Sequence, residues 1–185
     1  MKKFFIVLIA TLSLNAFGQD YFQQEVNYKI DVKLNDKNHS LSAYEEFEYI
    51  NNSTTNLDKI YIHLWPNAYK NNETALARQL YDMNNMVMQY ADASTLGFID
   101  SLAFKIDGND ARWEYDPEHI DIAILHLNSV LKPGESITVS TPFRVMLPSG
   151  DISRLGHVEE SYQITQWFPK PAVFDKNGWH AMPYL

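Results

Sequence analysis

Residues 25–34 read EVNYKIDVKL, and this stretch decides the fold class. Its apolar members stand at every second position, with polar or charged residues between them. Because successive side chains of a β-strand point to opposite faces, a period of two is typical of a strand with one buried and one solvated face. The stretch therefore predicts a half-buried β-strand.

The same alternation recurs along most of the chain. We expect further strands at residues 41–50, 60–65, 98–106, 112–115, 120–127, 136–143 and 162–168, the third strand ending at Pro66. Turn sequences separate them, such as Asp107-Gly108 and Lys132-Pro133-Gly134-Glu135. Glycine tolerates the positive φ that tight turns require, so these are hairpin or loop signals with a physical basis.

One stretch has the period of a helix instead. Leu76, Leu80, Met83 and Val87 recur at spacings of four, three and four residues, which places them on one helical face. This spacing predicts an α-helix over about residues 73–84, with Asn72 as its N-terminal cap. We therefore expect a mainly β fold, an antiparallel β-sandwich or saddle-like sheet with one helical excursion.

Composition supports one folded domain and excludes some partners. Of the 185 residues, 45% are hydrophobic and 14% aromatic, which is too apolar for a disordered chain. The formal net charge is −8, whereas binding to nucleic-acid phosphates needs clustered Lys and Arg, so nucleic acid is not an expected partner.

The first 18 residues have the layout of a secretory signal peptide. Lys2 and Lys3 precede an apolar run over residues 4–14, and Ala16 and Gly18 supply small side chains before a cleavage point. A membrane-spanning helix needs about 20 apolar residues, so no membrane span is expected after cleavage. The sequence predicts export to the periplasm or the extracellular space, with residues 19–185 as the mature domain. There is no cysteine, so disulfides contribute nothing.

Catalytic motifs are missing from the sequence. A zinc hydrolase would show His-Glu-x-x-His, and the nearest stretch, at residues 157–161, has Ser161 where the second histidine would stand. Asp116, Glu118 and Asp121 crowd one loop but lack the spacing of a dedicated calcium loop. We therefore expect no catalytic residue and no metal ligand within this chain.

Three carboxylates stand on the expected strand 41–50. By the period of two, Glu46 and Glu48 share one face and Glu45 takes the other. A solvated sheet edge explains them more simply than a catalytic pair.

Two segments carry a family resemblance. Residues 57–69, LDKIYIHLWPNAY, and residues 162–175, YQITQWFPKPAVFD, resemble the amino-terminal β-domain of aminopeptidase N-like (gluzincin) zinc metallopeptidases. In that family a saddle-like antiparallel domain precedes a thermolysin-like catalytic domain that holds zinc. The resemblance implies that this chain is a fragment, incomplete at its C-terminal end. Its partner would be its own C-terminal catalytic domain, with zinc held there and peptides as substrates.

The resemblance also assigns one substrate-binding residue. In the family a Thr-Gln pair reaches the active-site cleft, where the glutamine lines the pocket for the first side chain of the peptide, and Thr165-Gln166 matches this pair. A glutamate two residues further on helps to hold the free amine, but Phe168 stands at that position and cannot accept a hydrogen bond from an ammonium group. Gln166 is therefore the one expected binding residue, and without the resemblance it reads as a polar edge-strand residue.

A second class of function stays open. A free-standing extracellular β-sandwich that binds glycans would use the flat faces of Trp65, Trp113, Trp167 or Trp179 for stacking. Such a module is expected to expose a row of aromatic rings. A domain made to pack on a partner is expected to expose a contiguous apolar patch instead.

Overall fold

The period-two stretch forms the first and longest pairing of the fold. In the computed structural model, which describes residues 21–185, β1 (Glu25–Asn35) pairs antiparallel with β2 (Ser40–Ile50) along its whole length. Next to β2 lies β9 (Ser136–Met146), again antiparallel, although about ninety residues separate the two in sequence. The predicted signal peptide lies outside the described residues.

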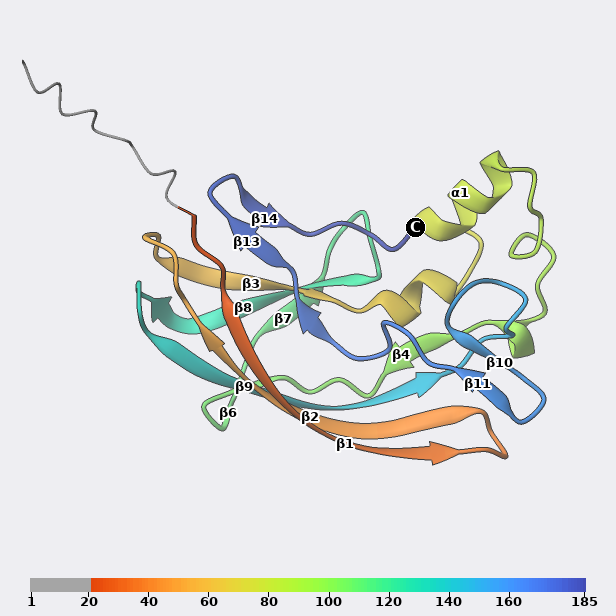
Figure 1. The fold of residues 1–185 in the computed structure, drawn as a ribbon, viewed down its shortest axis with the longest axis horizontal. Helices are drawn as coiled ribbons and strands as arrows, with labels where there is room; N and C mark the ends of the chain where they lie inside the picture. Colours follow the sequence, from red (N-terminus) through yellow and green to blue (C-terminus); the bar gives the residue numbers. More distant parts are fainter. Residues whose placement is uncertain (1–20) are drawn as a thin grey trace, which may run out of the picture.

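Two antiparallel sheets and two extra hairpins make up the fold (Figure 1). The larger sheet has the order β1-β2-β9-β5-β6, with β4 also paired to β9, and the smaller sheet has the order β12-β3-β8-β7. The other strands of the two sheets are β3 (Leu57–His63), β4 (Phe98–Asp100), β5 (Lys105–Ile106), β6 (Asn109–Asp110), β7 (Trp113–Tyr115), β8 (Ile122–Leu131) and β12 (Lys170–Pro171). The hairpins are β10 (Gly156–Val158) with β11 (Ser161–Gln163), and β13 (Val173–Asp175) with β14 (Gly178–His180).

The hydrophobic core fills the space between the two sheets. Phe47 and Val139 from the larger sheet and Ile60, Ile62 and Leu125 from the smaller sheet are all fully buried in one cluster. The predicted class, mainly β with antiparallel sheets and one helical excursion, is thus confirmed. None of the helices in the described part is long and apolar enough to cross a membrane.

The helix is shorter than predicted and has another cap. It is α1 (Ala75–Asp82), and its N-cap is Thr74, whose side chain accepts a hydrogen bond from the Ala77 amide. The same hydroxyl donates to the Ala68 carbonyl at 2.7 Å. Thr74 thus ties the helix start to the preceding 3-10 turn η1 (Trp65–Tyr69). The local sequence pattern around Asn72 does not show this contact, so the pattern predicts the wrong residue as the cap.

Several strand boundaries also differ from the prediction. β3 ends at His63, because the turn η1 begins at Trp65 and holds Pro66 in its first turn. The stretch predicted as one strand over residues 98–106 is two short strands, separated at Ser101, whose φ is 62°. Asp107-Gly108 does form the predicted tight hairpin, with φ of 50° and 80°.

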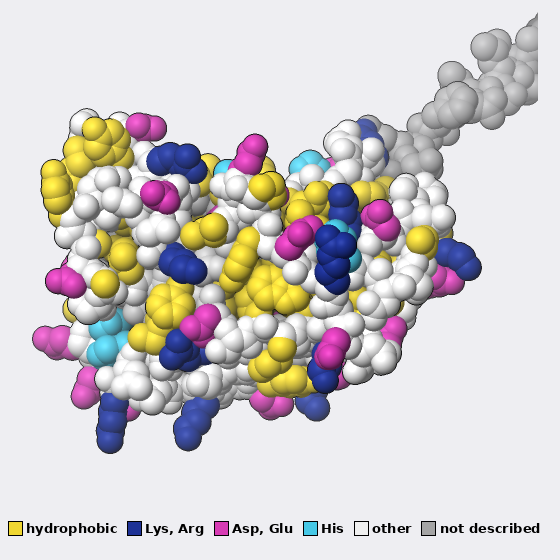
Figure 2. All heavy atoms as spheres, turned by 180° about the vertical axis from the view of Figure 1, so that it is seen from behind, with side chains coloured by type: hydrophobic (Ala, Val, Ile, Leu, Met, Phe, Trp, Pro, Cys, Tyr) yellow, Lys and Arg dark blue, Asp and Glu magenta, His cyan; other side chains and the backbone are white. Residues whose placement is uncertain are grey.

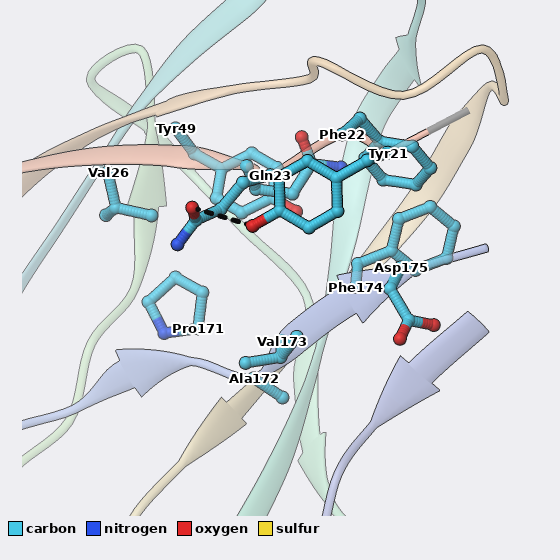
Figure 3. A pocket seen from close by; sticks show the side chains of 11 residues that line it. Tyr21, Phe22, Gln23, Val26, Tyr49, Pro171, Ala172, Val173, Phe174 and Asp175 are labelled. Carbon is cyan, nitrogen blue, oxygen red and sulfur yellow. Dashed lines mark hydrogen bonds between the residues drawn. The ribbon is translucent and has the colours of Figure 1, made fainter. Parts of the chain in front are cut away.

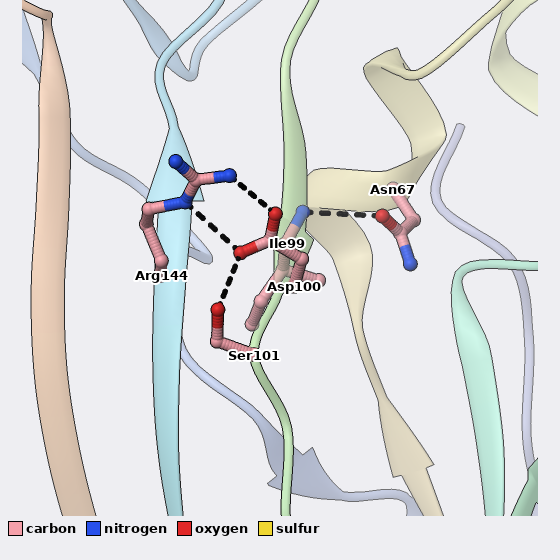
Figure 4. Close-up of polar contacts among 5 residues, drawn as sticks. All are labelled: Asn67, Ile99, Asp100, Ser101 and Arg144. Atoms are coloured by element: carbon pink, nitrogen blue, oxygen red, sulfur yellow. Dashed lines mark hydrogen bonds and ion pairs between the residues drawn. The ribbon is translucent and has the colours of Figure 1, made fainter.

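A cluster of polar contacts fixes β4 in place (Figure 4). On one side Arg144 of β9 donates from Nε to Asp100 Oδ1 at 3.0 Å and from Nη2 to Oδ2, a two-point ion pair. Beside this pair, Asn67 Oδ1 accepts from the Ile99 amide at 3.1 Å. These contacts join η1 to the larger sheet at one end of the molecule.

Candidate functional site

The segment that carries the predicted binding residue runs from β11 to β12. Residues 164–169 link the two strands without regular structure, so the predicted strand over residues 162–168 is wrong beyond Gln163. Thr165 Oγ1 donates to the Arg154 carbonyl at 2.9 Å, which fixes the segment just before Gln166.

Gln166 has an unusual backbone conformation. Its φ is 56°, in the left-handed region, and its side chain is exposed. Positive φ is ordinary for residues in hairpin turns such as Asp107 or Glu159, but Gln166 lies in no hairpin. A residue with a Cβ is strained there relative to glycine, so the surrounding contacts must hold this conformation.

Two aromatic residues directly after Gln166 provide those contacts. Trp167 packs on Phe143 of β9, with ring centroids 5.8 Å apart. Phe168 packs edge-on against both Trp167 and Tyr28 of β1, at 5.5 and 5.4 Å. Phe168 is therefore part of the packing between this segment and the larger sheet.

Glu45 is buried under the same part of the larger sheet. It is 0% exposed, and neither carboxylate oxygen has a hydrogen-bond partner in the described part of the chain. Burial raises its pKa to about 9, and burial followed by the Glu45 charge raises the pKa of Tyr28. The expectation that Glu45 belongs to a solvated edge is wrong, whereas Glu46 and Glu48 are exposed as expected. Glu45 stands two and four residues before Phe47 and Tyr49, so the period of two places it on the same buried face. This spacing was the sequence signal for its burial.

Two histidines join the hairpin β1–β2 to the hairpin β10–β11. The rings of His39 and His157 stack with centroids 3.6 Å apart and an interplanar angle of 9°. His39 Nδ1 lies 2.9 Å from the hydroxyl of Tyr162, which also donates to the Asp36 carbonyl at 3.3 Å. Burial and then the neighbouring His39 lower the pKa of His157. Sequence reasoning missed this cluster, because its members come from separate hairpins.

Lys170 and His63 form a second polar group on the smaller sheet. The Lys170 ammonium lies 3.9 Å from the centroid of the Trp65 ring, a cation–π contact, and His63 stacks on the same ring at 4.5 Å. Burial lowers the pKa of Lys170 to about 8. Burial and then the Lys170 charge lower the pKa of His63 to about 4, so His63 is neutral at pH 7.

A surface groove lies between the start of β1 and the strands β12 and β13 (Figure 3). It has a volume of about 260 Å³ and is lined mainly by apolar and aromatic side chains, including Phe22, Tyr49 and Phe174. The one carboxylate in its described lining, Asp175, is 2.9 Å from Nε2 of His180. The carboxylate of the described lining is thus paired with an imidazole.

The acidic loop considered for calcium is occupied by backbone contacts. Asp116 Oδ1 accepts from the amides of Glu118 and His119, and Asp121 Oδ2 accepts from the Tyr184 amide at 2.7 Å. Within residues 21–185 no three His, Cys, Asp or Glu side chains are grouped to hold a metal ion.

The molecular surface is mixed rather than uniformly polar. Figure 2 shows apolar side chains gathered in the middle of one face, with single charged residues among them. Near the end of the described chain Val173, Met182 and Leu185 are 65%, 64% and 56% exposed. The four tryptophans are all partly buried, so they do not form an exposed aromatic row.

Similarity to known proteins is found among solved structures. No protein-family model matches the sequence, and no curated protein matches it. The chain is similar to a mutant of an M1 zinc metallopeptidase from Deinococcus radiodurans, with 13% sequence identity and a TM-score of 0.43. This match covers 69% of this chain and 22% of that one. It is also similar to a mutant two-domain M1 zinc metallopeptidase bound to L-arginine, with 15% identity, a TM-score of 0.43, and coverage of 70% and 22%. The chain therefore spans about a fifth of the length of these structures.

Proposed function

We propose that this chain is a non-catalytic β-domain of an exported aminopeptidase N-like zinc metallopeptidase, and that Gln166 lines the substrate cleft of the complete enzyme. The observation that carries this proposal is the exposed Gln166 side chain on a strained backbone. The residue stands where the sequence resemblance places a cleft-lining glutamine. Backbone strain of this kind clusters at binding and catalytic sites, where the position of a side chain matters more than local stability.

The contacts around Gln166 support a positioning role for the domain. Thr165 fixes the segment before it, and Trp167 and Phe168 anchor the segment after it on the larger sheet. A backbone held between two such anchors loses little further freedom when a ligand binds, so the segment can present the Gln166 side chain at a lower entropic cost than a mobile loop. Zinc and the groups that activate water would belong to the catalytic domain, which would pack on exposed apolar residues such as Val173 and Met182.

Phe168 bears on how the enzyme would recognise the free amine of a peptide. Because Phe168 packs against Tyr28 and Trp167, it offers no acceptor for an ammonium group at the family's glutamate position. The proposal therefore assigns amine recognition to acidic groups of the catalytic domain. The glycan-binding alternative gains no support, since each tryptophan is partly buried.

The test uses the full-length protein and hydrolysis of aminoacyl dye substrates. Gln166→Gly relieves the positive-φ strain and removes the side chain, so it is expected to raise stability by up to about 1 kcal/mol. The same variant is expected to lower kcat/KM about tenfold. The control Gln163→Ala replaces an exposed glutamine on β11 and is expected to leave stability and kcat/KM unchanged.

Two results would overturn the proposal. One is a coding sequence beyond Leu185 that contains no His-Glu-x-x-His motif, together with a full-length protein that binds no zinc. The other is a zinc peptidase in which Gln166→Gly keeps its full kcat/KM, which would leave the domain assignment standing but remove the role of Gln166.

A further inference from the structure

The outer edge of the larger sheet is formed by a long strand without a neighbour. β1 stands at the end of the strand order, and no other described strand pairs with its second edge. It is eleven residues long, whereas edge strands in monomeric proteins are usually short or interrupted. Its free backbone amides and carbonyls are a template for one more strand.

The face of β1 that points to the core side is only partly covered. Tyr28 packs on Phe47 and Phe168, but Tyr28, Val32 and Leu34 remain 39%, 51% and 41% exposed. These residues alternate with charged ones, so one face of the free edge is apolar and the other is charged. An added strand would have to match both faces.

Two copies of the β1 sequence are complementary to each other when they pair in antiparallel orientation. If two copies pair about Ile30, Lys29 of each copy lies opposite Asp31 of the other, and this happens twice. On the apolar face Tyr28 then meets Val32, and Val26 meets Leu34. Neither Lys29 nor Asp31 forms an ion pair within the described chain, so both charges are free to pair across such an edge.

Neighbouring registers are less favourable for the same strand. Pairing centred on Asp31 places Asp31 opposite its own copy and Lys29 opposite Lys33, so like charges meet at three positions. Pairing centred on Lys29 places the two Lys29 ammonium groups opposite each other at the middle of the interface. Charged residues usually keep edge strands apart, but here their signs and spacing favour one register.

We propose that β1 is a self-association edge, on which a second copy of this chain pairs antiparallel about Ile30 to continue the larger sheet. The proposal does not depend on the peptidase assignment. It commits to a homodimer with twofold symmetry, in which the same surface of both copies is used.

Sedimentation velocity of the full chain over a micromolar concentration series tests this dimer. Asp31→Lys places a new ammonium group opposite Lys29 of the other copy and is expected to raise the dimer Kd by about tenfold or more. The double variant Lys29→Asp with Asp31→Lys restores opposite charges and is expected to restore dimerisation. Asp110→Lys makes the same charge change on β6 and serves as the control. Circular dichroism of each variant reports whether it is folded.

Cross-linking tests the register. Because the chain has no cysteine, Ile30→Cys provides one thiol per copy, and the proposed pairing brings the two thiols opposite each other. Oxidation is expected to give a covalent dimer with Ile30→Cys, but not with Val130→Cys, a half-exposed residue of β8. A monomer at all concentrations overturns the proposal. If the β1 amides that point away from β2 are also protected from hydrogen exchange, another strand of the same chain occupies the edge. Dimerisation that Asp31→Lys leaves unchanged overturns it as well.

Discussion

Glu45 lies on the apolar face of β2, two residues from Phe47, with both carboxylate oxygens unpartnered in the described part of the chain. Directly opposite on β9 is Thr141, which is also fully buried but accepts from the Ala103 amide at 2.9 Å. A buried charge without a partner is costly, so the folded state holds Glu45 in its protonated form. This accounts for the direction of its pKa shift.

Stability is expected to fall as the pH rises because of Glu45. Its pKa in the folded state is raised from 4.5 to about 9, so between these values the folded protein holds a proton that the unfolded chain has released. The contribution of protonated Glu45 to the free energy of unfolding is complete below pH 4.5. It is lost as the pH rises through about 9, and the free energy of unfolding falls by up to about 1.4 kcal/mol per pH unit.

Chemical denaturation at several pH values measures this dependence. Glu45→Gln keeps the shape of the side chain without a titrating group, so its free energy of unfolding is expected to lack the slope. The control Glu46→Gln, on the neighbouring position of β2, keeps it. Equal slopes in Glu45→Gln and the unmodified chain would show that Glu45 is solvated.

At the scale of the elements, the hairpins β1–β2 and β10–β11 meet through a pair of imidazole rings. His39 and His157 stack at 3.6 Å, and Tyr162 completes the contact. The charged groups around this contact are Asp36 and Glu160, both close to Tyr162. Because the stacked rings are close together, a charge on one opposes a charge on the other.

Acid is expected to loosen the hairpin β10–β11. The pKa of His157 is lowered in the folded state, so the fold favours neutral His157 and loses this contribution as the pH falls below about 6.5. Hydrogen exchange of the His157 amide, which donates to the Pro148 carbonyl, reports on the hairpin. After correction for intrinsic rates, exchange should be faster at pH 5 than at pH 7.

Two variants separate this effect from general acid unfolding. His157→Phe keeps an aromatic ring for stacking but cannot take up a proton, so its exchange at this amide should not depend on pH. The control His126→Phe, on β8, should retain the pH dependence. The same acid response in His157→Phe would assign the effect to another group.

At the scale of the whole molecule, the two sheets are held together by large side chains between them. Tyr49 is 0% exposed and stacks on Trp179 of the hairpin β13–β14 at 6.4 Å. Its hydroxyl has no hydrogen-bond partner in the described chain, and burial raises its pKa. Its ring, rather than its hydroxyl, is expected to stabilise the sandwich.

Replacing Tyr49 in two ways tests that expectation. Tyr49→Phe removes an unsatisfied buried hydroxyl, so the free energy of unfolding should stay the same or rise by up to about 1 kcal/mol. Tyr49→Ala leaves a cavity and should cost about 3–5 kcal/mol. Both are measured by denaturant unfolding. A loss of more than about 1 kcal/mol in Tyr49→Phe would mean that the hydroxyl has a partner, for example a buried water.

Local sequence pattern by itself determined the mainly β class and the long strands of this protein, but not the short hairpin strands β10, β13 and β14. The period of two in residues 25–34 and the Asp107-Gly108 turn are set by the geometry of a few consecutive residues, so both were predictable. Boundaries were predicted wrongly where a distant contact decides them, as with Thr74 at the start of α1.

Tertiary structure alone decided the environment of the individual polar residues. The burial of Glu45 depends on β9 pairing with β2 across about ninety residues of sequence, and the stacking of His39 on His157 depends on two distant hairpins. The left-handed conformation of Gln166 likewise depends on Trp167 and Phe168 packing against the larger sheet. Periodicity is a property of neighbouring residues, whereas burial, pKa and strain arise from contacts between segments that only the folded chain brings together.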